Sequence, residues 1–195
     1  MYTELLFTNR PPAGDEAYVG GGARMDSSVS WPTDETGAPL MHLMAIPSSW
    51  FGDDSMAGWI SIFIPYVPNE VSHYARLRAR EGTSAAKVIA YNPVDSMRNE
   101  YAALNLDAKA VVQSECDEED DDENLASKLG GVRAWLQKPI TVPGYHYAMA
   151  IYGGDLDEPL SPARGILSDG LGYLFLAEEG ARANGDAGRF FLQLG

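Results

Sequence analysis

The sequence predicts an α+β fold that is mostly β, built from two similar layered halves with a few short helices. Short apolar stretches bounded by Gly, Pro or Asp recur along the 195 residues, a pattern typical of strands joined by turns. The 20 glycines and 12 prolines also favour many turns. Short strings from the first half recur in the same order in the second half, which indicates a duplicated unit.

Eight stretches are expected to form strands because they are short, apolar and bounded by turn residues. The segment "WISIFI", inside residues 58–67, alternates less than a half-exposed strand would, so we expect it to be covered on both faces. In chain order, the expected strands lie within residues 40–47, 58–67, 85–93, 108–115, 132–140, 145–153, 172–179 and 188–194.

Two helices are expected. The first extends from Asn69, a candidate N-cap, to Gly82, which ends it. The second covers residues 95–106. Apolar residues recur at helical spacing in both segments, namely Val71, Tyr74 and Leu77 in the first and Met97, Tyr101 and Leu104 in the second.

Three strings carry the internal repeat. "GGARM" at 21–25 is answered by "GGVRA" at 130–134, "HLMAI" at 42–46 by "HYAMAI" at 146–151, and "GWISIFI" at 58–64 by "GLGYLFL" at 170–176. We therefore predict a single domain, 1–195, with an internal duplication of residues 20–114 and 124–195 joined by an acidic linker, 115–123. Chance recurrence of short apolar strings is the alternative.

The same strings also carry a family likeness. The stretch 20–47, with Trp31-Pro32 and "GAPLMHLMAIP", together with "SKLGGVRAWLQKP" at 127–139 and "GRFFLQLG" at 188–195, resembles the YwqG-like family. The likeness extends over about residues 20–193 and is weakest in 68–122. The family has no established function, so the resemblance implies a mostly β fold of two layered halves rather than a reaction. The chain departs from the family where the first strand usually continues into Ala-Gln-Ile, because it reads Met44-Ala45-Ile46 there and lacks the Gln.

Composition and charge exclude several classes of function. Hydrophobic residues make up 45% and charged residues 22% of the chain, which is a globular balance. The net charge is -14, and residues 115–123 hold eight of the 28 acidic residues. This sign argues against nucleic acid or an anionic membrane surface as a partner. Cys116 is alone, so no intrachain disulfide forms. We expect no cofactor, and we expect the protein to be cytoplasmic because no signal peptide or spanning segment is recognisable.

The acidic run, residues 115–123, allows three interpretations: a solvated linker first, a docking surface for a basic partner second, and a metal site third. An EF-hand would need Gly at its sixth position, but the sixth residue from Asp117 is Asp122. Trp50 joins the docking surface as an aromatic contact residue, with a core anchor as its alternative. The candidate partner surface is thus Glu115, Asp117, Glu118, Glu119, Asp120, Asp121, Asp122, Glu123 and Trp50.

The three histidines give a weaker signal. His42 and His146 stand at matching points of the repeat, so they are candidates for a cleft between the halves, where two imidazoles and a carboxylate would bind a metal. The alternative is that each ring donates to a backbone carbonyl. His73, on the first expected helix, is expected at the surface.

No pattern predicts catalytic residues or a metal site. There is no Gly-x-Ser-x-Gly, and Gly20–Gly22 lacks the Lys-Ser or Lys-Thr of a phosphate loop. The leading hypothesis is a non-enzymatic, cytoplasmic protein-binding module, in particular an immunity-type protein that neutralises a basic toxin or effector. The alternative is a small-ligand or metal-binding protein, or an unrecognised enzyme, with a site between the halves.

Overall fold

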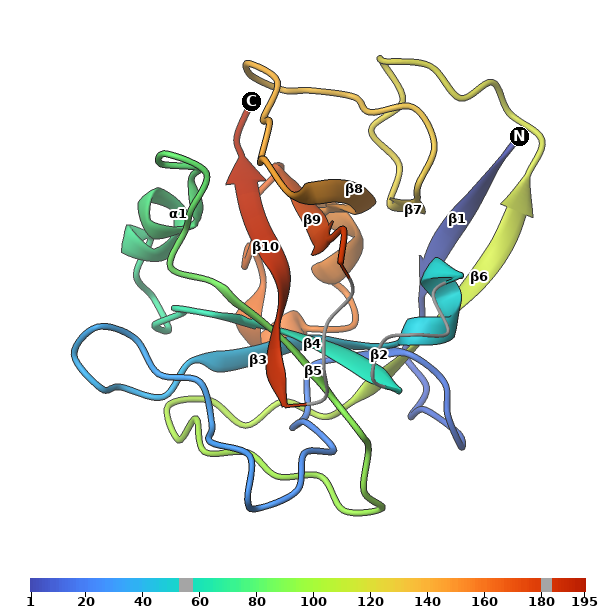
Figure 1. Ribbon diagram of the computed structural model, residues 1–195. Helices are drawn as coiled ribbons and strands as arrows, with labels where there is room; N and C mark the ends of the chain where they lie inside the picture. Colours follow the sequence, from blue (N-terminus) through green and yellow to red (C-terminus); the bar gives the residue numbers. More distant parts are fainter. Residues whose placement is uncertain (53–57, 180–183) are drawn as a thin grey trace.

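A computed structural model describes residues 1–52, 58–179 and 184–195, in which ten antiparallel strands close into a barrel (Figure 1). Around the barrel the order is β1-β6-β2-β3-β4-β5-β10-β9-β8-β7, and β7 pairs with β1 to complete it. The strands are β1 (Tyr2–Phe7), β2 (Tyr18–Val19), β3 (Met41–Pro47), β4 (Trp59–Ile64), β5 (Lys87–Tyr91), β6 (Lys109–Cys116), β7 (Lys128–Leu129), β8 (Tyr145–Tyr152), β9 (Leu171–Ala177) and β10 (Gly185–Gln193). The helical turns are η1 (Ser48–Phe51), α1 (Ser72–Leu77), η2 (Gly153–Leu156) and η3 (Ser161–Ala163).

Strands β2 to β5 and strands β7 to β10 follow the same order and register. In each set the short first strand is followed by two glycines with positive φ, Gly20 and Gly21 or Gly130 and Gly131. A register shift then follows His42 in β3 and Tyr147 in β8. The partners correspond: Met44 pairs with Val19 and Ile62, and Met149 pairs with Leu129 and Leu174.

The barrel interior is one apolar core that both halves share. Leu43 and Ile62 of the first half contribute to it together with Met149, Leu174 and Phe190 of the second. All six residues of β4 are buried, as expected for a strand covered on both faces. The mostly β class of the fold is thus confirmed.

Two smaller apolar layers cover the barrel from outside. In the first half, Trp31 packs edge-on against Phe63, with 5.0 Å between the ring centres. In the second half, residues 132–142 form a strap that lays Trp135 on Tyr173 at 4.8 Å. Each layer lies over strands of its own half.

Seven of the eight expected strand stretches contain strands, and the prediction for 132–140 was wrong. That stretch is the strap, whose apolar residues pack on the outer layer. The backbone of the strap forms hydrogen bonds with the Gln193 side chain instead of with a neighbouring strand. The Gln137 N–H donates to Gln193 Oε1, and Gln193 Nε2 donates to the Lys138 carbonyl. The six-residue strand β1 and the two-residue strands β2 and β7 were not expected.

The helix predictions were only partly correct. Helix α1 lies inside the first expected helix, but Val71 precedes it, and Asn69 has a φ of 64° rather than a capping conformation. Residues 95–106 form no helix, because Arg98 pairs with Ala23 and donates to two carbonyls of residues 26–29. No helix in the described ranges is long and apolar enough to cross a membrane.

His73 was expected at the surface but is 2% exposed. Its Nδ1 lies 3.1 Å from the Glu70 carbonyl oxygen and its Nε2 lies 2.9 Å from that of Ile166. The hydroxyl of the neighbouring Tyr74 donates to the Gly165 carbonyl. His73 and Tyr74 therefore attach α1 to the segment after η3, and burial lowers the pKa of His73.

Candidate functional site

A pocket of about 340 Å³ opens at one end of the barrel, and we call it the mouth pocket. Thr3 and Gln113 stand two residues beyond Leu5 and Val111, which belong to the core, so they line the same interior face. The two-residue β7 pairs with β1 only at Thr3 and Glu4, and η1 contributes Trp50 and Phe51 to the wall. The pocket is lined by Thr3, Trp50, Phe51, Gln113, Leu129, Gly130, His146, Tyr147 and Ala148.

Trp50 separates the mouth pocket from a second pocket of about 570 Å³, the acidic pocket. Both pockets share Trp50 and Gln113 as wall residues. The acidic pocket adds Asp15 and Glu16, and the Glu16 carboxylate is bound by Arg10, which does not line the pocket. Trp50 is only partly buried against the core, so its indole is accessible from this surface. Asp15 lies 3.6 Å from Arg24 but its side chain is 89% exposed, so this carboxylate and the nearby indole form a surface suited to a cationic side chain.

A third pocket of about 400 Å³, the tyrosine pocket, shares Gly130, His146 and Tyr147 with the mouth pocket. Arg133 and Glu178 supply its charges. The three pockets therefore adjoin through common walls, and together we call them the mouth groove, from Asp15 past Trp50, His146 and Tyr147 to Arg133. The groove joins elements from both halves of the chain.

The hydroxyl group of Tyr147 is buried and has no hydrogen-bond partner among the described residues. Burial raises its pKa, and the guanidinium carbon of Arg133 lies 5.8 Å from the centre of its ring. A buried hydroxyl without a partner is costly, so this atom is a place where water or a ligand would add a hydrogen bond.

His42 occupies the register position in β3 that Tyr147 occupies in β8, opposite Phe63 and Phe175 respectively. Its Nδ1 lies 3.0 Å from the Gly20 carbonyl oxygen, which can only accept, so Nδ1 carries the proton. Nε2 then accepts from Ser61 Oγ at 3.0 Å, and the Tyr91 hydroxyl donates to that oxygen at 2.8 Å. The network is complete, and burial lowers the pKa of His42 to about 4.

His42 and His146 do not form one site. His42 is 1% exposed and sealed in the outer layer of the first half, whereas His146 is exposed and lines the mouth and tyrosine pockets. The register explains the difference, because residue 147, not 146, corresponds to His42. The structure instead brings His146 to the same pocket as Trp50.

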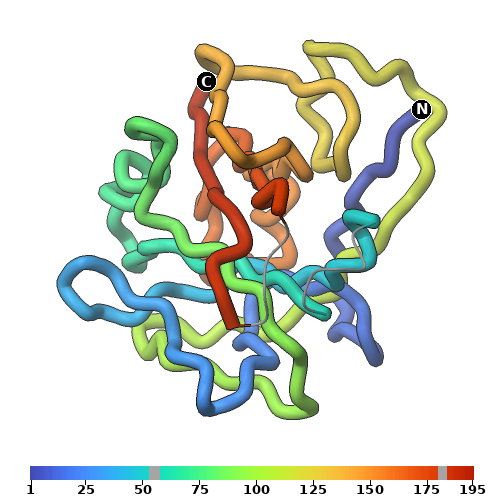
Figure 2. The backbone as a smooth tube through the Cα atoms, in the orientation of Figure 1, coloured from blue at the N-terminus to red at the C-terminus, as the bar shows by residue number. Residues whose placement is uncertain are grey.

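The acidic run is divided between strand and loop. Glu115 and Cys116 end β6, so the connection begins at Asp117 rather than at 115. Figure 2 shows this connection beside the N-terminus, where the Met1 amine donates to the Glu118 carbonyl at 3.1 Å. Seven of the acidic side chains are exposed: Glu115, Asp117, Glu118, Glu119, Asp121, Asp122 and Glu123.

Asp120 is the exception in the run. Its carboxylate binds the ammonium group of Lys128, which is 1% exposed, and accepts from the Val132 N–H at 2.7 Å. Burial opposes ionisation, but the hydrogen bonds from Lys128 and Val132 hold the pKa of Asp120 below its ordinary value. Asp120 therefore serves the fold and is not available to a partner.

No three His, Cys, Asp or Glu side chains in the described ranges converge so that they would hold a metal ion. The Ser127 hydroxyl donates to Asp155 at 2.7 Å, but it also accepts from the Tyr152 N–H at 2.8 Å, which makes it a structural link between β7 and β8. The mouth groove thus offers binding groups: aromatic rings, one imidazole and carboxylates.

No protein-family model matches this chain, and no curated protein matches it significantly. The resemblance to the YwqG-like family therefore stays a prediction. Four of the five residues of its "SKLGG" motif have a structural role here: Ser127 links two strands, Lys128 binds Asp120, and Gly130 and Gly131 turn the chain with positive φ.

The sequence singled out Trp50 and His146 but missed Gln113, Tyr147 and Arg133. The position of Tyr147 could have been predicted. When the repeat is aligned on Met44 and Met149 instead of on the histidines, Tyr147 takes the position equivalent to that of His42. Gln113 and Arg133 could not have been predicted in this way, since only the tertiary fold brings β6 and the strap to the groove.

Proposed function

We propose that this chain is a non-enzymatic protein-binding module whose mouth groove takes up an extended basic segment of a partner. The observation that carries the proposal is the position of Trp50. Its accessible indole stands between two pockets, with the exposed carboxylate of Asp15 on one side and Gln113 at the shared wall. Glu115, the first residue of the acidic run, is exposed on the same strand, two residues beyond Gln113.

Lysine and arginine side chains suit this surface in two ways. Their charged ends are attracted by the carboxylates and by the face of an indole, and their alkyl stems pack on apolar walls such as Phe51 and Leu129. The exposed acids would raise the rate of association with a basic protein, in a salt-dependent way. An immunity-type inhibitor of a basic toxin or effector is the specific form of this proposal, supported by the net charge of -14.

The test is selection of binders from a random peptide display library, with the selected peptides titrated against variants by fluorescence anisotropy. The run-neutral variant replaces the seven exposed acids by Asn or Gln and keeps Asp120, because Lys128 needs it. We expect selected peptides to be rich in Lys and Arg and to lose affinity as salt rises. In the run-neutral variant the affinity and its salt dependence should both fall, and Trp50→Ala should weaken binding at least tenfold.

Asp95→Asn combined with Asp107→Asn is the control, since both acids are exposed and neither lines the mouth groove. Peptides without basic residues would contradict the proposal, as would full affinity in the Trp50→Ala variant. Unchanged salt dependence in the run-neutral variant would remove the acidic run from the proposed surface.

The unpartnered Tyr147 hydroxyl supports a second candidate, a small polar ligand in the tyrosine pocket. Arg133 and His146 would supply further donors and Glu178 an acceptor. A thermal-shift screen of sugars, nucleotides and metal ions tests it, because a ligand at a hundred times its Kd adds about 2.7 kcal/mol of stability. A flat response across the screen would remove this candidate.

We also infer that the two halves arose by duplication and that the protein is cytoplasmic. The shared strand order, the register shifts after His42 and Tyr147, and the positive-φ glycine pairs support the duplication. Homologous sequences test it, since the two halves of their averaged profiles should align at Met44 and Met149. Fractionation of the source cells tests the location.

A further inference from the structure

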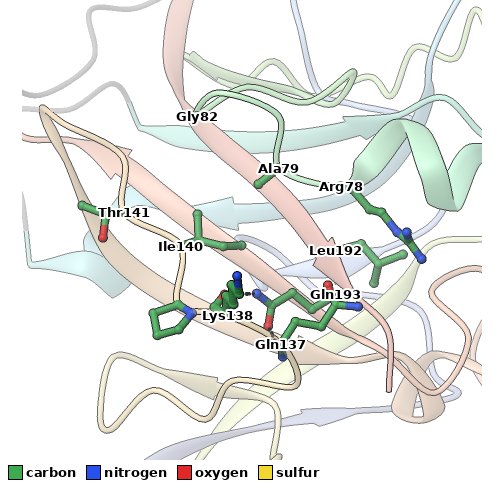
Figure 3. Close-up of a pocket in the computed structure, with 10 residues that line it drawn as sticks. Arg78, Ala79, Gly82, Gln137, Lys138, Ile140, Thr141, Leu192 and Gln193 are labelled. Atoms are coloured by element: carbon green, nitrogen blue, oxygen red, sulfur yellow. Dashed lines mark hydrogen bonds between the residues drawn. The ribbon is translucent and has the colours of Figure 1, made fainter.

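A separate pocket of about 400 Å³ lies on the other side of the strap, and we call it the strap pocket. It shares Ile140 and Thr141 with the tyrosine pocket, so the strap separates the two. Figure 3 shows Arg78 at the exit of α1, Lys138 and Ile140 on the strap, and Leu192 and Gln193 on β10. None of the three pockets of the mouth groove contains Arg78 or Lys138.

The charge of the strap pocket is opposite to that of the chain. The protein carries -14, yet no acidic residue lines this pocket, and Arg78 and Lys138 both do. Seven of the 14 basic residues take part in ion pairs, but no carboxylate in the described ranges pairs with Arg78 or Lys138. Both cationic groups of this concave site are therefore available to bind an anionic ligand.

The wall between the two cations is held in place by a buried amide. Gln193 is 4% exposed, and its Oε1 accepts from the Gln137 N–H at 3.0 Å and from the Tyr173 hydroxyl at 3.3 Å. Its Nε2 donates to the Lys138 carbonyl at 2.7 Å. Because this side chain fixes the backbone that carries Lys138, less conformational freedom is lost when a ligand binds.

The apolar part of the wall includes Ala79, Pro139 and Ile140, with Leu192 beneath them. Leu192 is fully buried and Ile140 is half-buried. The pocket thus combines an apolar floor with two cations at its edge, which is how a ligand with an anionic group and an apolar body is bound.

We propose that the strap pocket binds a small organic anion, with a carboxylate or phosphate group held by Arg78 and Lys138 and an apolar body on Ile140 and Pro139. The guanidinium of Arg78 matches the planar oxygen pair of a carboxylate, or two oxygens of a phosphate, and Lys138 adds a point charge. Arg78 and Lys138 line no pocket of the mouth groove, and the proposal does not rest on the function proposed above.

The experiment is an NMR titration of the full chain with three probes: benzoate, inorganic phosphate and benzyl alcohol. The side-chain amide signals of Gln193 and Gln137 report binding at the pocket. We expect benzoate to bind and to shift these signals, while benzyl alcohol, which lacks the charge, binds at least tenfold more weakly. A phosphate response with no benzoate response would identify a phosphate ligand, and the reverse would identify a carboxylate ligand.

Arg78→Gln and Lys138→Gln should each weaken the binding of the active probe about tenfold, because each removes one charged hydrogen bond. Lys87→Gln is the control, since Lys87 is exposed on β5 and does not line the pocket. The proposal is overturned if neither anion shifts the Gln193 amide, if benzyl alcohol binds as tightly as benzoate, or if both variants retain the wild-type Kd.

Discussion

The carboxylate of Asp120 holds the buried ammonium group of Lys128, and this pair anchors the acidic run to the second half of the barrel. Lys128 lies in β7, which pairs with both β1 and β8, so the contact stands where the barrel closes. The ring of Tyr2 completes the site, with its centre 5.3 Å from the Lys128 Nζ atom. An ion pair this deeply buried stabilises the fold only while both partners are present.

Asp120→Ala should therefore lower the free energy of unfolding by about 3–5 kcal/mol, because it leaves the Lys128 charge buried without a partner. Urea unfolding at pH 7 measures the change. Asp122→Asn is the matched control from the same run: its side chain is exposed, and the change should stay within about 0.5 kcal/mol. The double variant Asp120→Ala, Lys128→Met should recover part of the loss. Equal effects at 120 and 122 would contradict the anchoring role.

The two glycines after β7 should respond differently to substitution. Both have positive φ, 57° at Gly130 and 74° at Gly131, so alanine costs about 1–2 kcal/mol of backbone strain at either position. A Cβ atom at Gly130 meets nothing within 4 Å, but at Gly131 it would lie 2.3 Å from the Asp120 carboxylate. Gly131→Ala should thus cost more than Gly130→Ala in urea unfolding, since it also displaces the partner of Lys128. Equal losses of stability in the two variants would mean that the loop carrying Asp120 shifts away from the new methyl group without weakening the contact with Lys128.

Sequence patterns predicted those parts of the fold that depend on local chemistry. Long apolar stretches such as β4 and β8 were recognisable because burial requires apolar residues over their length. The strands β2 and β7 have only two residues each, and a pattern of that length carries no period. The strap and the stretch 95–106 were misread because tertiary contacts of Gln193 and Arg98 decide their conformation.

The candidate site was less predictable than the fold. Trp50 and His146 were named, but their meeting depends on β8 and η1 lying at the same end of the barrel, which no spacing in the sequence reveals. Asp120 looked like its neighbours in the run, and only the position of Lys128 distinguishes it. Charge composition is visible in a sequence, whereas the pairing of charges is a property of the fold.

Ser127→Ala should destabilise the protein by about 1–3 kcal/mol, since it removes a donor from Asp155 and an acceptor from the Tyr152 N–H. Burial raises the pKa of Asp155, and the Ser127 hydroxyl opposes that shift by binding the ionised form. The loss should therefore be larger at pH 7 than at pH 4, where Asp155 is closer to neutral. Unfolding in urea at both pH values measures it, with exposed Ser96→Ala as the control. A loss of the same size at both pH values would separate Ser127 from Asp155.

Acid should destabilise the fold through His42 before most carboxylates titrate. Its pKa is about 4 in the folded protein, because burial disfavours the imidazolium, against about 6.5 in an unfolded chain. The unfolded state binds the proton first, so stability falls as pH drops from about 6.5 to 4, by about 3 kcal/mol from His42 alone. His73, whose pKa is also lowered by burial, adds to the loss in the same direction.

An NMR titration of the three imidazoles measures this directly, and urea unfolding between pH 7 and pH 4 measures its consequence. His42→Gln keeps a donor for the Gly20 carbonyl and removes the titrating group, so the slope should fall by the contribution of His42, and the part due to His73 should remain. His146→Gln is the control, because His146 is exposed and should leave the slope intact. A His42 midpoint near 6.5, or an unchanged slope in His42→Gln, would mean that the network of His42, Ser61 and Tyr91 opens to solvent in the folded protein.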